Sequence, residues 1–452
     1  MLERKAYQDL LKWKAKKGRT ALLIEGARRV GKSTLIREFG RKEYRSMLYI
    51  DCSRLAEPVR QYFLDNRNRL ESLQQFLAAV YDVTLYPRES LIVFDEVQQF
   101  PPAREMMKHF VADGKYDYIE SGSLLSIKQN VADIVLPSEE ESLRLNPLDF
   151  EEFLWAVGER PLAEFIRSSF TTEAPLPQAL HRKATYSFRE YLLVGGMPSV
   201  VSRYLENRSF AEADEEKRQI LKLYRDDIGR FAFGYKDKVT SIFDEIPEQL
   251  AKHEKRFNLA SLGKDARLRT YEEAFFWLSD AEITNPCWAA DDPSVGLSLS
   301  RSSSSLKCYM ADTGLLVTMA LADSRVTQEN IYQAVLLGRV GLNEGMLTEN
   351  IVAQTLMAKG DRLFFYNRSG KEGNNERMEI DFLVIRPWNK GGDKPRVTPI
   401  EVKSGARYST LSLDRFREKF SRRTGTAYVV HPGQYKKEED LVHVPLYMVH
   451  CL

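Results

Sequence analysis

The sequence of 452 residues contains few of the residues that would make it a disulfide-bonded, metal-clustering or membrane protein. Its four cysteines are far apart and form no CxxC pair or Cys/His cluster: Cys52, Cys287, Cys308 and Cys451. This pattern is typical of a reducing compartment and predicts neither a disulfide framework nor a structural zinc site. No apolar run approaches the ~18 residues of a membrane span, and the charged N-terminus lacks the apolar core of a signal peptide. We therefore expect a soluble, cytoplasmic protein without a membrane partner.

The sequence also lacks an excess of charge of one sign. Lysine and arginine number 66 against 64 aspartate and glutamate residues, which gives a formal net charge of +2. This balance excludes a whole-protein attraction to nucleic acid, so any basic surface has to be local. With 43% hydrophobic residues the chain is typical of a globular protein, and its length predicts about three domains.

A phosphate-binding motif is present near the N-terminus. The motif G-x-x-x-x-G-K-[ST] occurs without a gap, and with the threonine after it comprises Gly26, Ala27, Arg28, Arg29, Val30, Gly31, Lys32, Ser33 and Thr34. Glycines let the backbone wrap phosphate groups, so that its N–H groups and the next helix N-terminus face negative charge. In such a loop Lys32 reaches the β- and γ-phosphates and the Ser33 hydroxyl binds Mg²⁺. The alternative is a chance glycine-rich turn, but a strand-like run precedes the motif and a helix-like run follows it.

A second apolar run, residues 90–94, ends in the two carboxylates Asp95 and Glu96. Such a run is typical of a buried parallel strand, and open α/β sheets place their ligands at the carboxyl ends of strands. Asp95 suits the Mg²⁺ site through the water shell of the metal. Glu96 suits the polarisation of the attacking water as a general base.

Further strand candidates are residues 46–51, which lie between the two motifs, and residues 116–120, which lead to Ser121 and Ser123. An additional strand between the motifs, with a glutamate after the aspartate, resembles the AAA+ and related ATPases rather than small-molecule kinases. The resemblance implies ATP as the nucleotide, and no guanine-reading N-K-x-D word occurs. It also places Ser121 or Ser123 where AAA+ proteins keep a polar residue that senses the γ-phosphate. An ordinary polar strand end is the alternative for both serines.

Several further short sequence motifs follow one another along the chain, at residues 147–153, 191–198, 221–226, 309–315 and 348–352. Together with the two motifs above, they resemble a family of predicted bacterial and archaeal AAA+ ATPases with a C-terminal domain of unknown function. The resemblance covers nearly the whole chain and implies the architecture more than the biochemical role. AAA+ assemblies usually present an arginine from a neighbouring subunit, but the acidic segment 135–144 offers only Arg144. The arginine finger and the oligomeric state are therefore left unassigned, although an oligomer is compatible with the sequence.

Residues 257–310 predict a winged helix-turn-helix. Two helix-like stretches, 257–263 and 270–278, precede two strand candidates that are joined by a serine-rich loop at 297–305. This fold often docks DNA with one helix in the major groove. The expected recognition helix exposes Glu272 and Glu273, however, so a winged helix used for protein packing is the alternative.

The C-terminal part contains a second chemical pattern. Asp381 lies in the strand-like run 379–385, and Glu401 and Lys403 lie in a returning strand at 398–403. Residues two apart in a strand face the same side, so Glu401 and Lys403 would project together beside Asp381. This arrangement is similar to PD-(D/E)XK nucleases, in which the acids hold Mg²⁺ and the lysine steadies the attacking hydroxide or the developing phosphorane.

The nuclease resemblance implies one more metal-binding acid, Glu349, in a helix-like stretch. It departs from the pattern before Asp381, where Ile380 replaces proline. Such folds also persist as modules that bind DNA or protein without cleaving, so cleavage stays open.

A basic bias surrounds the C-terminal pattern. Only Asp414 and Glu418 oppose nine basic residues: Lys403, Arg407, Arg415, Arg417, Lys419, Arg422, Arg423, Lys436 and Lys437. Such a local excess suits a phosphate backbone, which makes DNA the expected partner. A solvated helix face over residues 414–423 is the alternative.

Taken together, the sequence predicts an α/β protein in four parts. These are a P-loop AAA+-type parallel-sheet core (1–155), a helical lid or bundle (156–245), a winged helix (246–335) and a PD-(D/E)XK nuclease-like, restriction-endonuclease-like domain (336–452). ATP and Mg²⁺ are the expected cofactors. The leading hypothesis is an ATPase that couples nucleotide turnover to DNA recognition or processing. The alternative is an ATP-driven signalling or interaction switch whose C-terminal domain binds a protein partner without cleaving DNA.

Overall fold

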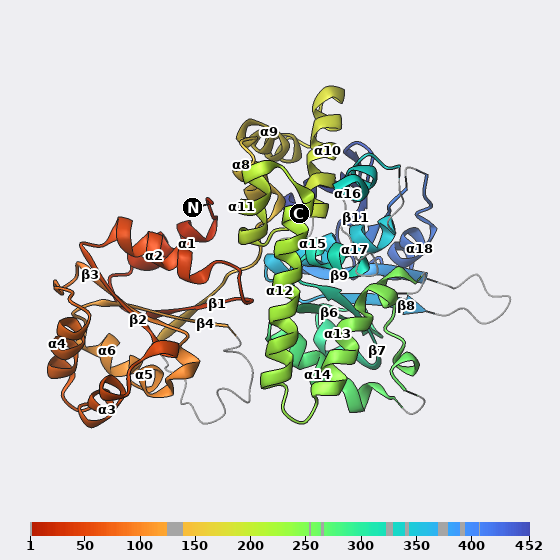
Figure 1. Cartoon of the computed structure of the whole chain (residues 1–452). Coiled ribbons are helices and arrows are strands. Elements are labelled where there is room, and N and C mark those ends of the chain that lie inside the picture. The colour runs from red at the N-terminus through yellow and green to blue at the C-terminus, as the bar shows by residue number, and fades with distance from the viewer. Residues whose placement is uncertain are drawn as a thin grey trace. The chain divides into compact units, whose positions relative to one another are not determined.

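The computed structural model describes residues 2–123, 139–252, 255–263, 266–321, 329–339, 343–368, 378–388, 394–405 and 407–452. It divides into two compact units (Figure 1). Unit 1 comprises residues 1–146 with 280–282, and unit 2 comprises residues 147–279 and 283–452. The four-part division stays a prediction within this coarser one. Among the described residues, no helix is both long and apolar enough to cross a membrane.

Unit 1 is a parallel α/β layer structure. In chain order its elements are α1 (Ala6–Lys14), β1 (Ala21–Glu25), α2 (Lys32–Glu43), β2 (Ser46–Asp51), η1 (Cys52–Arg54), α3 (Glu57–Asp65), α4 (Leu70–Val80), β3 (Ser90–Asp95), η2 (Val97–Gln99), α5 (Pro101–Glu105), α6 (Met107–Asp113), β4 (Asp117–Gly122) and β5 (Glu140–Arg144). The five strands are all parallel and lie in the order β2-β3-β4-β1-β5. The predicted α/β fold with a parallel sheet is confirmed for this unit.

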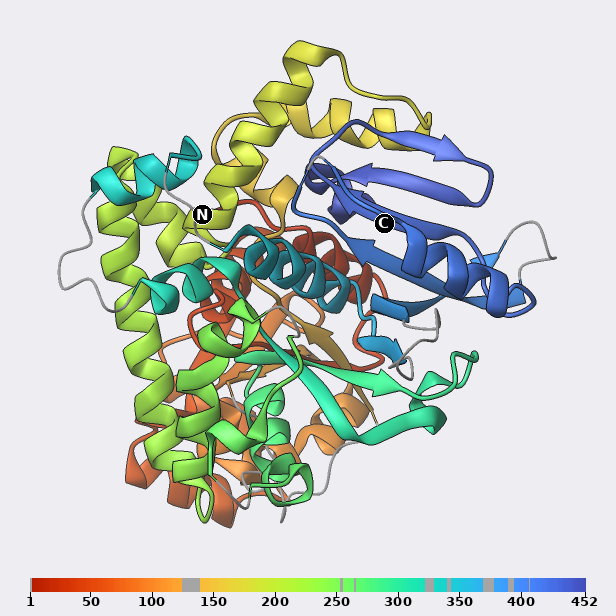
Figure 2. The same cartoon turned by 90° about the vertical axis from the view of Figure 1, so that its right-hand side faces the viewer.

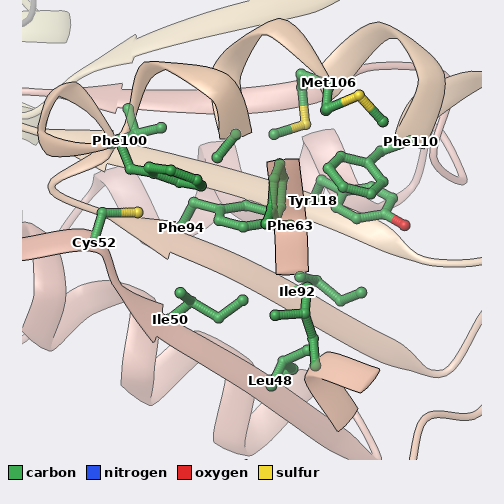
Figure 3. Close-up of a cluster of buried hydrophobic side chains, with 14 of the residues drawn as sticks. Leu48, Ile50, Cys52, Phe63, Ile92, Phe94, Phe100, Met106, Phe110 and Tyr118 are labelled. Carbon is green, nitrogen blue, oxygen red and sulfur yellow. The ribbon is translucent and has the colours of Figure 1, made fainter. Parts of the chain in front are cut away.

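Strand β3 lies inside the sheet of unit 1 and is covered on both faces, which explains why it is a nearly continuous apolar run. All six residues of β3 are buried. Ile92 and Phe94 point into one core with Phe63 and Phe110, as Figure 3 shows, whereas the alternate residues join a second core with α1 and α2. This alternation is the period of two of a β-strand. The carboxyl end of β3 thereby holds Asp95 and Glu96 at the edge of a rigid sheet.

Unit 2 begins with helices and continues into a mixed sheet. Its elements are α8 (Phe150–Ala156), α9 (Arg160–Thr171), α10 (Gln178–Val194), α11 (Pro198–Asn207), α12 (Phe210–Phe231), α13 (Lys236–Ala251), η3 (Leu259–Ser261), α14 (Leu268–Asp280), β6 (Thr284–Ala290), η4 (Leu297–Ser300), β7 (Arg301–Met310), α15 (Thr313–Ala320), α16 (Glu329–Leu336), α17 (Glu344–Ala358), β8 (Phe364–Arg368), β9 (Met378–Trp388), β10 (Lys394–Val402), α18 (Leu411–Lys419), β11 (Ala427–His431), β12 (Lys436–Glu438), β13 (Leu441–Pro445) and η6 (Leu446–Cys451). The last residue of α14, Asp280, is counted with unit 1.

The strands of unit 2 form one eight-stranded sheet in the order β12-β13-β11-β10-β9-β8-β6-β7. The two strands expected for the wing, β6 and β7, therefore form an edge of the same sheet that contains the C-terminal strands (Figures 1 and 2). β6 pairs with β7 on one side and, in parallel, with β8 on the other. Pairing with β8 satisfies backbone groups of β6 that would otherwise be left open on a separate hairpin.

Two local predictions in the middle of the chain are wrong. Residues 301–305, predicted as part of the serine-rich loop, belong to β7, which pairs with β6 at Arg301 and again from Leu306 onward with an irregularity between them. The first helix expected for the winged fold, 257–263, is only the 3₁₀ turn η3. Asn258 accepts a hydrogen bond from the N–H of Ala260 there, a local contact that competes with a longer helix.

The break between α10 and α11 contains Gly195 and Gly196. Gly195 has φ +85°, which favours glycine. The backbone of Gly196 forms two hydrogen bonds with neighbouring segments. The N–H of Gly196 donates to Asp312 Oδ2 at 2.7 Å, and its carbonyl accepts from the N–H of Leu148 at 2.7 Å. A Cβ atom on Gly196 would lie 2.2 Å from the carbonyl oxygen of Leu148. Only glycine fits this junction.

Replacing Gly196 by alanine is expected to destabilise unit 2 by about 1–3 kcal/mol, because the backbone of Leu148 would have to move. The matched control is Gly229→Ala within α12, where the nearest atoms to an added Cβ lie 3.8 Å away. Alanine in a helix interior is favoured over glycine by about 0.5–1 kcal/mol. Thermal unfolding of both variants checks the prediction, and equal melting temperatures for the two would contradict it.

Candidate functional sites

The phosphate-binding motif forms the turn between β1 and the N-terminus of α2. Gly31 has φ +98° and Arg29 has φ +70°, both in the left-handed region. A Cβ atom on Gly26 would lie 2.5 Å from the carbonyl oxygen of Leu145. Gly26 and Gly31 are therefore required by the backbone itself, the first by crowding and the second by its dihedral angle.

Lys32 is folded into the loop. Its Nζ donates to the carbonyl oxygens of Gly26 at 2.6 Å and Ala27 at 3.1 Å, and the side chain is buried. Burial lowers the pKa of Lys32 from its ordinary value, while the charges of Glu96 and Asp95 act in the opposite direction. The loop thus holds a cation at its centre, where the predicted phosphates would bind.

The carboxylate of Asp95 accepts hydrogen bonds from three hydroxyl groups. Ser33 donates to Asp95 Oδ2 at 2.8 Å, Tyr49 donates to the same oxygen, and Ser121 donates to Oδ1. Tyr49, on β2, was not predicted, and the only signal for it is its place on the strand beside β3. Burial raises the pKa of the Tyr49 phenol, and the bond to Asp95 raises it further. The tyrosine therefore stays a hydrogen-bond donor.

Glu96 follows Asp95 in a left-handed backbone conformation, with φ +53°. Gln98 Nε2 donates to Glu96 Oε2 at 2.6 Å and to the carbonyl oxygen of Ser123 at 2.9 Å. The hydroxyl of Ser123 also reaches Glu96 Oε2, at 3.4 Å. The structure therefore brings the two predicted serines to the two acids, Ser121 to Asp95 and Ser123 to Glu96. Gln98 was missed because nothing in its sequence context distinguishes it from an ordinary surface glutamine.

Replacing Gln98 by methionine, which has similar length and no donor, is expected to lower ATP turnover on the order of 10-fold, since a general base loses efficiency when it is misplaced. The KM for ATP is expected to change little, because Gln98 does not touch the phosphate-binding loop in the contacts described above. The matched control is Gln99→Met, whose side chain is exposed. A parallel loss of turnover in both variants, or an unchanged turnover in Gln98→Met, would contradict the positioning role.

The residues at this edge of the sheet fit a nucleotide with Mg²⁺. Mg²⁺ prefers oxygen ligands, and in nucleotide sites it is held by one or two protein oxygens together with phosphates and waters. The Ser33 hydroxyl and the Asp95 carboxylate lie together, 2.8 Å apart, at the N-terminus of α2. This ligand set requires no acid besides Asp95, so the carboxylate of Glu96 is available for the proton transfer that the sequence predicts.

The second candidate site lies in unit 2. Asp381 is on β9, Glu401 is on β10 and Glu349 is on α17; Glu349 and Glu401 are buried, and the side chain of Asp381 is 13% exposed. The N–H of Val402 donates to Asp381 Oδ2 at 2.8 Å, which joins the two strands at this point. Lys403 Nζ donates to Glu401 Oε1 at 2.6 Å.

Two lysines that were not predicted lie among these acids. Lys307 on β7 is 1% exposed, and its Nζ lies 3.6 Å from Glu349, 3.8 Å from Glu379 and 3.5 Å from Asp381. Lys255 Nζ lies 2.5 Å from Glu349 Oε1. The only signal for Lys307 in the sequence is a lysine directly before the apolar residues 308–310. We call Lys255, Lys307, Glu349, Glu379, Asp381, Glu401 and Lys403 the carboxylate–lysine cluster.

The pKa values in the cluster follow from burial and these contacts. Burial, with the charge of Glu349, raises the pKa of Asp381 to about 6, and burial raises that of Glu401 to about 7. Burial alone would raise the pKa of Glu349, but Lys307 and Lys255 outweigh it and hold the pKa below its ordinary value. The surrounding carboxylates likewise outweigh the burial of Lys307 and raise the pKa of its ammonium group. Both shifts favour the ionised forms of Lys307 and Glu349.

The cluster does not fit the Mg²⁺ that the nuclease resemblance implies. Glu349 Oε1 accepts from Lys255, and its Oε2 accepts from the Tyr309 hydroxyl at 2.8 Å. Within the described part of the chain, no three His, Cys, Asp or Glu side chains are arranged to hold a metal ion. Glu349, Asp381 and Glu401 are thus close in space, as predicted, but lysines rather than open space lie between them.

Several basic residues of the C-terminal bias are also paired with acids. Arg423 lies 2.5 Å from Asp292, Arg417 lies 3.8 Å from Asp414, and Lys436 and Lys437 contact Glu438 and Glu173. These pairs are exposed, so phosphate groups could replace the acids at little cost. The positive surface is weaker than the sequence count suggests.

Three family models match successive parts of the chain. Residues 18–154 match a model described as AAA domain, residues 185–326 match Domain of unknown function (DUF8612), and residues 344–449 match Domain of unknown function (DUF4143). The first match contains the phosphate-binding loop, Asp95 and Glu96. With the parallel sheet, it makes unit 1 an AAA-type ATPase domain. No curated protein matches the chain.

Solved structures give only distant likenesses. C. elegans PCH-2 is 12% identical with a TM-score of 0.23, over 38% of this chain and 47% of that one. Pif1 helicase from Candida albicans is 12% identical with a TM-score of 0.23, over 40% and 47%. The Drosophila ORC bound to AT-rich DNA and Cdc6 is 10% identical with a TM-score of 0.22, over 71% and 92%. This chain thus spans about half the length of the first two, and TM-scores this low carry no argument about function.

Proposed function

We propose that this chain hydrolyses ATP at the edge of the unit 1 sheet, with Lys32, Ser33, Asp95 and Glu96 in the roles that the sequence predicts. The observation that carries the proposal is the meeting of Ser33 and Asp95, 2.8 Å apart, beside a lysine that the loop itself encloses. Residues 26–34 surround the phosphates with backbone N–H groups. Lys32 leaves its carbonyl partners and neutralises charge on the β- and γ-phosphates.

Glu96 is the general base of the proposed reaction. It accepts a proton from the attacking water, and Gln98 and Ser123 hold its carboxylate in place. Bound Mg²⁺ supplies positive charge beside the phosphates. Ser33 and Asp95, which lie 2.8 Å apart, are the residues that would hold this metal. Ser121, on β4, donates to Asp95 and fixes its orientation. Loss of the γ-phosphate beside Asp95 would therefore be transmitted to β4 through the hydroxyl of Ser121.

Phosphate release from Mg²⁺-ATP tests the proposal, with Glu96→Gln as the blank. Steady turnover that this variant lacks is the expected result. Turnover equal in both proteins would reject Glu96 as the base, and the absence of turnover in the wild-type chain would reject the activity.

Two couplings of this turnover are supported by different observations. DNA recognition is favoured by the exposed Arg407, Lys419 and Arg422 of unit 2, because such residues suit a phosphate backbone. An interaction switch with a protein partner is favoured by the acids that pair with the other basic residues, such as Asp292 and Glu173.

The same assay separates the two couplings when duplex, single-stranded and branched DNA are added. Stimulation of phosphate release by one DNA form supports DNA recognition and identifies the preferred form. Turnover that no DNA form changes supports the switch and directs the search to a protein partner. Increasing salt is expected to weaken any DNA stimulation steeply, because phosphate contacts release counterions.

A further inference from the structure

The carboxylate–lysine cluster contains a buried ammonium group where the nuclease resemblance places a metal. Lys307 Nζ lies within 4 Å of three carboxylates from two elements, Glu349 on α17 and Glu379 and Asp381 on β9. Its side chain is 1% exposed and comes from the paired interior of β7. Its ammonium also lies 5.2 Å from the ring centre of Phe365 on β8. A side chain fixed in this way cannot turn outward to solvent to make room.

The oxygens that a metal would need are already used. Glu349 accepts from Lys255 and Tyr309, and Asp381 accepts from the N–H of Val402 through Oδ2, while its Oδ1 faces Lys307. Glu401 offers the exception. Its Oε1 accepts from Lys403, and its Oε2 is buried without a hydrogen-bond partner among the described residues. Mg²⁺ is usually held by one or two carboxylates together with waters, and among the described residues of this set only this one buried oxygen is left without a donor.

The balance of charges in the cluster also disfavours a bound Mg²⁺. Four carboxylates (Glu349, Glu379, Asp381 and Glu401) face three ammonium groups (Lys255, Lys307 and Lys403). If Lys403 were the only lysine beside these four carboxylates, their excess negative charge would attract a divalent cation. With Lys255 and Lys307 present, a divalent cation would approach buried positive charges, which repel it strongly in a low-dielectric interior.

We propose that Lys307 is the resident cation of this centre, so that Glu349, Asp381 and Glu401 bind no Mg²⁺ and unit 2 does not cleave phosphodiester bonds by metal-dependent chemistry. Lys307 acts instead as a positioning residue, which ties β7 to β9 and α17. Unit 2 then binds its partner without cutting it, whether that partner is DNA or protein.

Binding of Mn²⁺ to the full-length, nucleotide-free chain tests the proposal directly. The background is Asp95→Asn, which removes the acid of the unit 1 metal site. Mn²⁺ is titrated into this variant and the free ion is followed by electron paramagnetic resonance. The double variant Asp95→Asn with Asp381→Asn is expected to bind the same amount of Mn²⁺ as Asp95→Asn alone. A stoichiometric site that Asp381→Asn removes would overturn the proposal. So would Mg²⁺- or Mn²⁺-dependent nicking of supercoiled DNA that disappears in Asp381→Asn.

A second variant tests the role of Lys307 itself. Lys307→Met keeps the length of the side chain and removes its charge, so Glu349, Glu379 and Asp381 lose their shared cation. The variant is expected to melt at a lower temperature than wild type and to regain part of the loss in millimolar Mn²⁺, whereas wild type and the exposed control Lys436→Met do not respond. A folded Lys307→Met chain that gains nothing from Mn²⁺ would contradict the idea that Lys307 keeps the metal out. If the variant does not fold, the wild-type titration still decides.

Discussion

Replacing Glu96 by glutamine is expected to lower ATP turnover by about 10²–10⁴-fold, the usual contribution of a general base. Glutamine keeps the size of the side chain and can still receive the hydrogen bond from Gln98, but it cannot accept the proton of the attacking water. Nucleotide binding is expected to persist, since Lys32, Ser33 and the loop are unchanged. The loss should therefore appear in kcat and not in the affinity for ATP.

Two measurements on the same protein check this expectation. Phosphate release under saturating ATP gives the turnover, and isothermal titration with a non-hydrolysable ATP analogue gives the affinity. The matched control is Glu105→Gln on α5, an exposed acid whose side chain pairs with Arg67 at 3.6 Å and lies outside the site. Turnover within about threefold of wild type in Glu96→Gln would mean that another group takes the proton, because general-base loss is far larger.

Loss of the Lys307 charge is the second large effect that the structure predicts. Lys307→Met is expected to destabilise unit 2 by about 3–5 kcal/mol, because removing one partner of a buried ion pair leaves uncompensated charge in the interior. Here one ammonium group serves three carboxylates, and the side chain is 1% exposed. The same substitution at Lys436, whose side chain is 66% exposed, is expected to change stability little.

Denaturant unfolding followed by tryptophan fluorescence suits this comparison. Four of the five tryptophans, Trp155, Trp277, Trp288 and Trp388, belong to unit 2, so the signal reports mainly on that unit. Lys307→Met combined with Asp381→Asn is expected to lose less than the two single losses added, since each removes the other's partner. Losses that add without coupling would show that the two side chains do not interact.

The nucleotide site could be predicted from the sequence because its determinants are local. Gly26 and Gly31 are needed by the turn that they form, and the residues from Gly26 to Thr34 are consecutive, so one contiguous motif specifies both the backbone and the ligand groups. β3 could also be predicted from the sequence, because a strand buried on both faces is a continuous apolar run, and this run ends at Asp95. The roles of these residues in hydrolysis stay predictions.

Tyr49 and Gln98 show the limit of local reasoning within the same site. Tyr49 reaches Asp95 because β2 lies beside β3 in parallel register, with Asp51 opposite Asp95. Strand order and register are long-range properties that no short motif encodes. Gln98 reaches Glu96 only because Glu96 adopts a left-handed conformation that folds the chain back on itself.

The sequence by itself determined that unit 1 has a glycine-containing loop after the first strand of a parallel sheet, and that Asp381 and Glu401 lie on neighbouring strands. Only the tertiary structure decided what lies between the acids of unit 2. β6 and β7 join the sheet of the C-terminal strands, and this pairing brings Lys307 from a distant part of the chain to Glu349 and Asp381. Hydrophobic periodicity specifies which face of a strand is buried, but which buried groups meet depends on strand order. The chemistry of a buried charge is therefore settled by its tertiary neighbours.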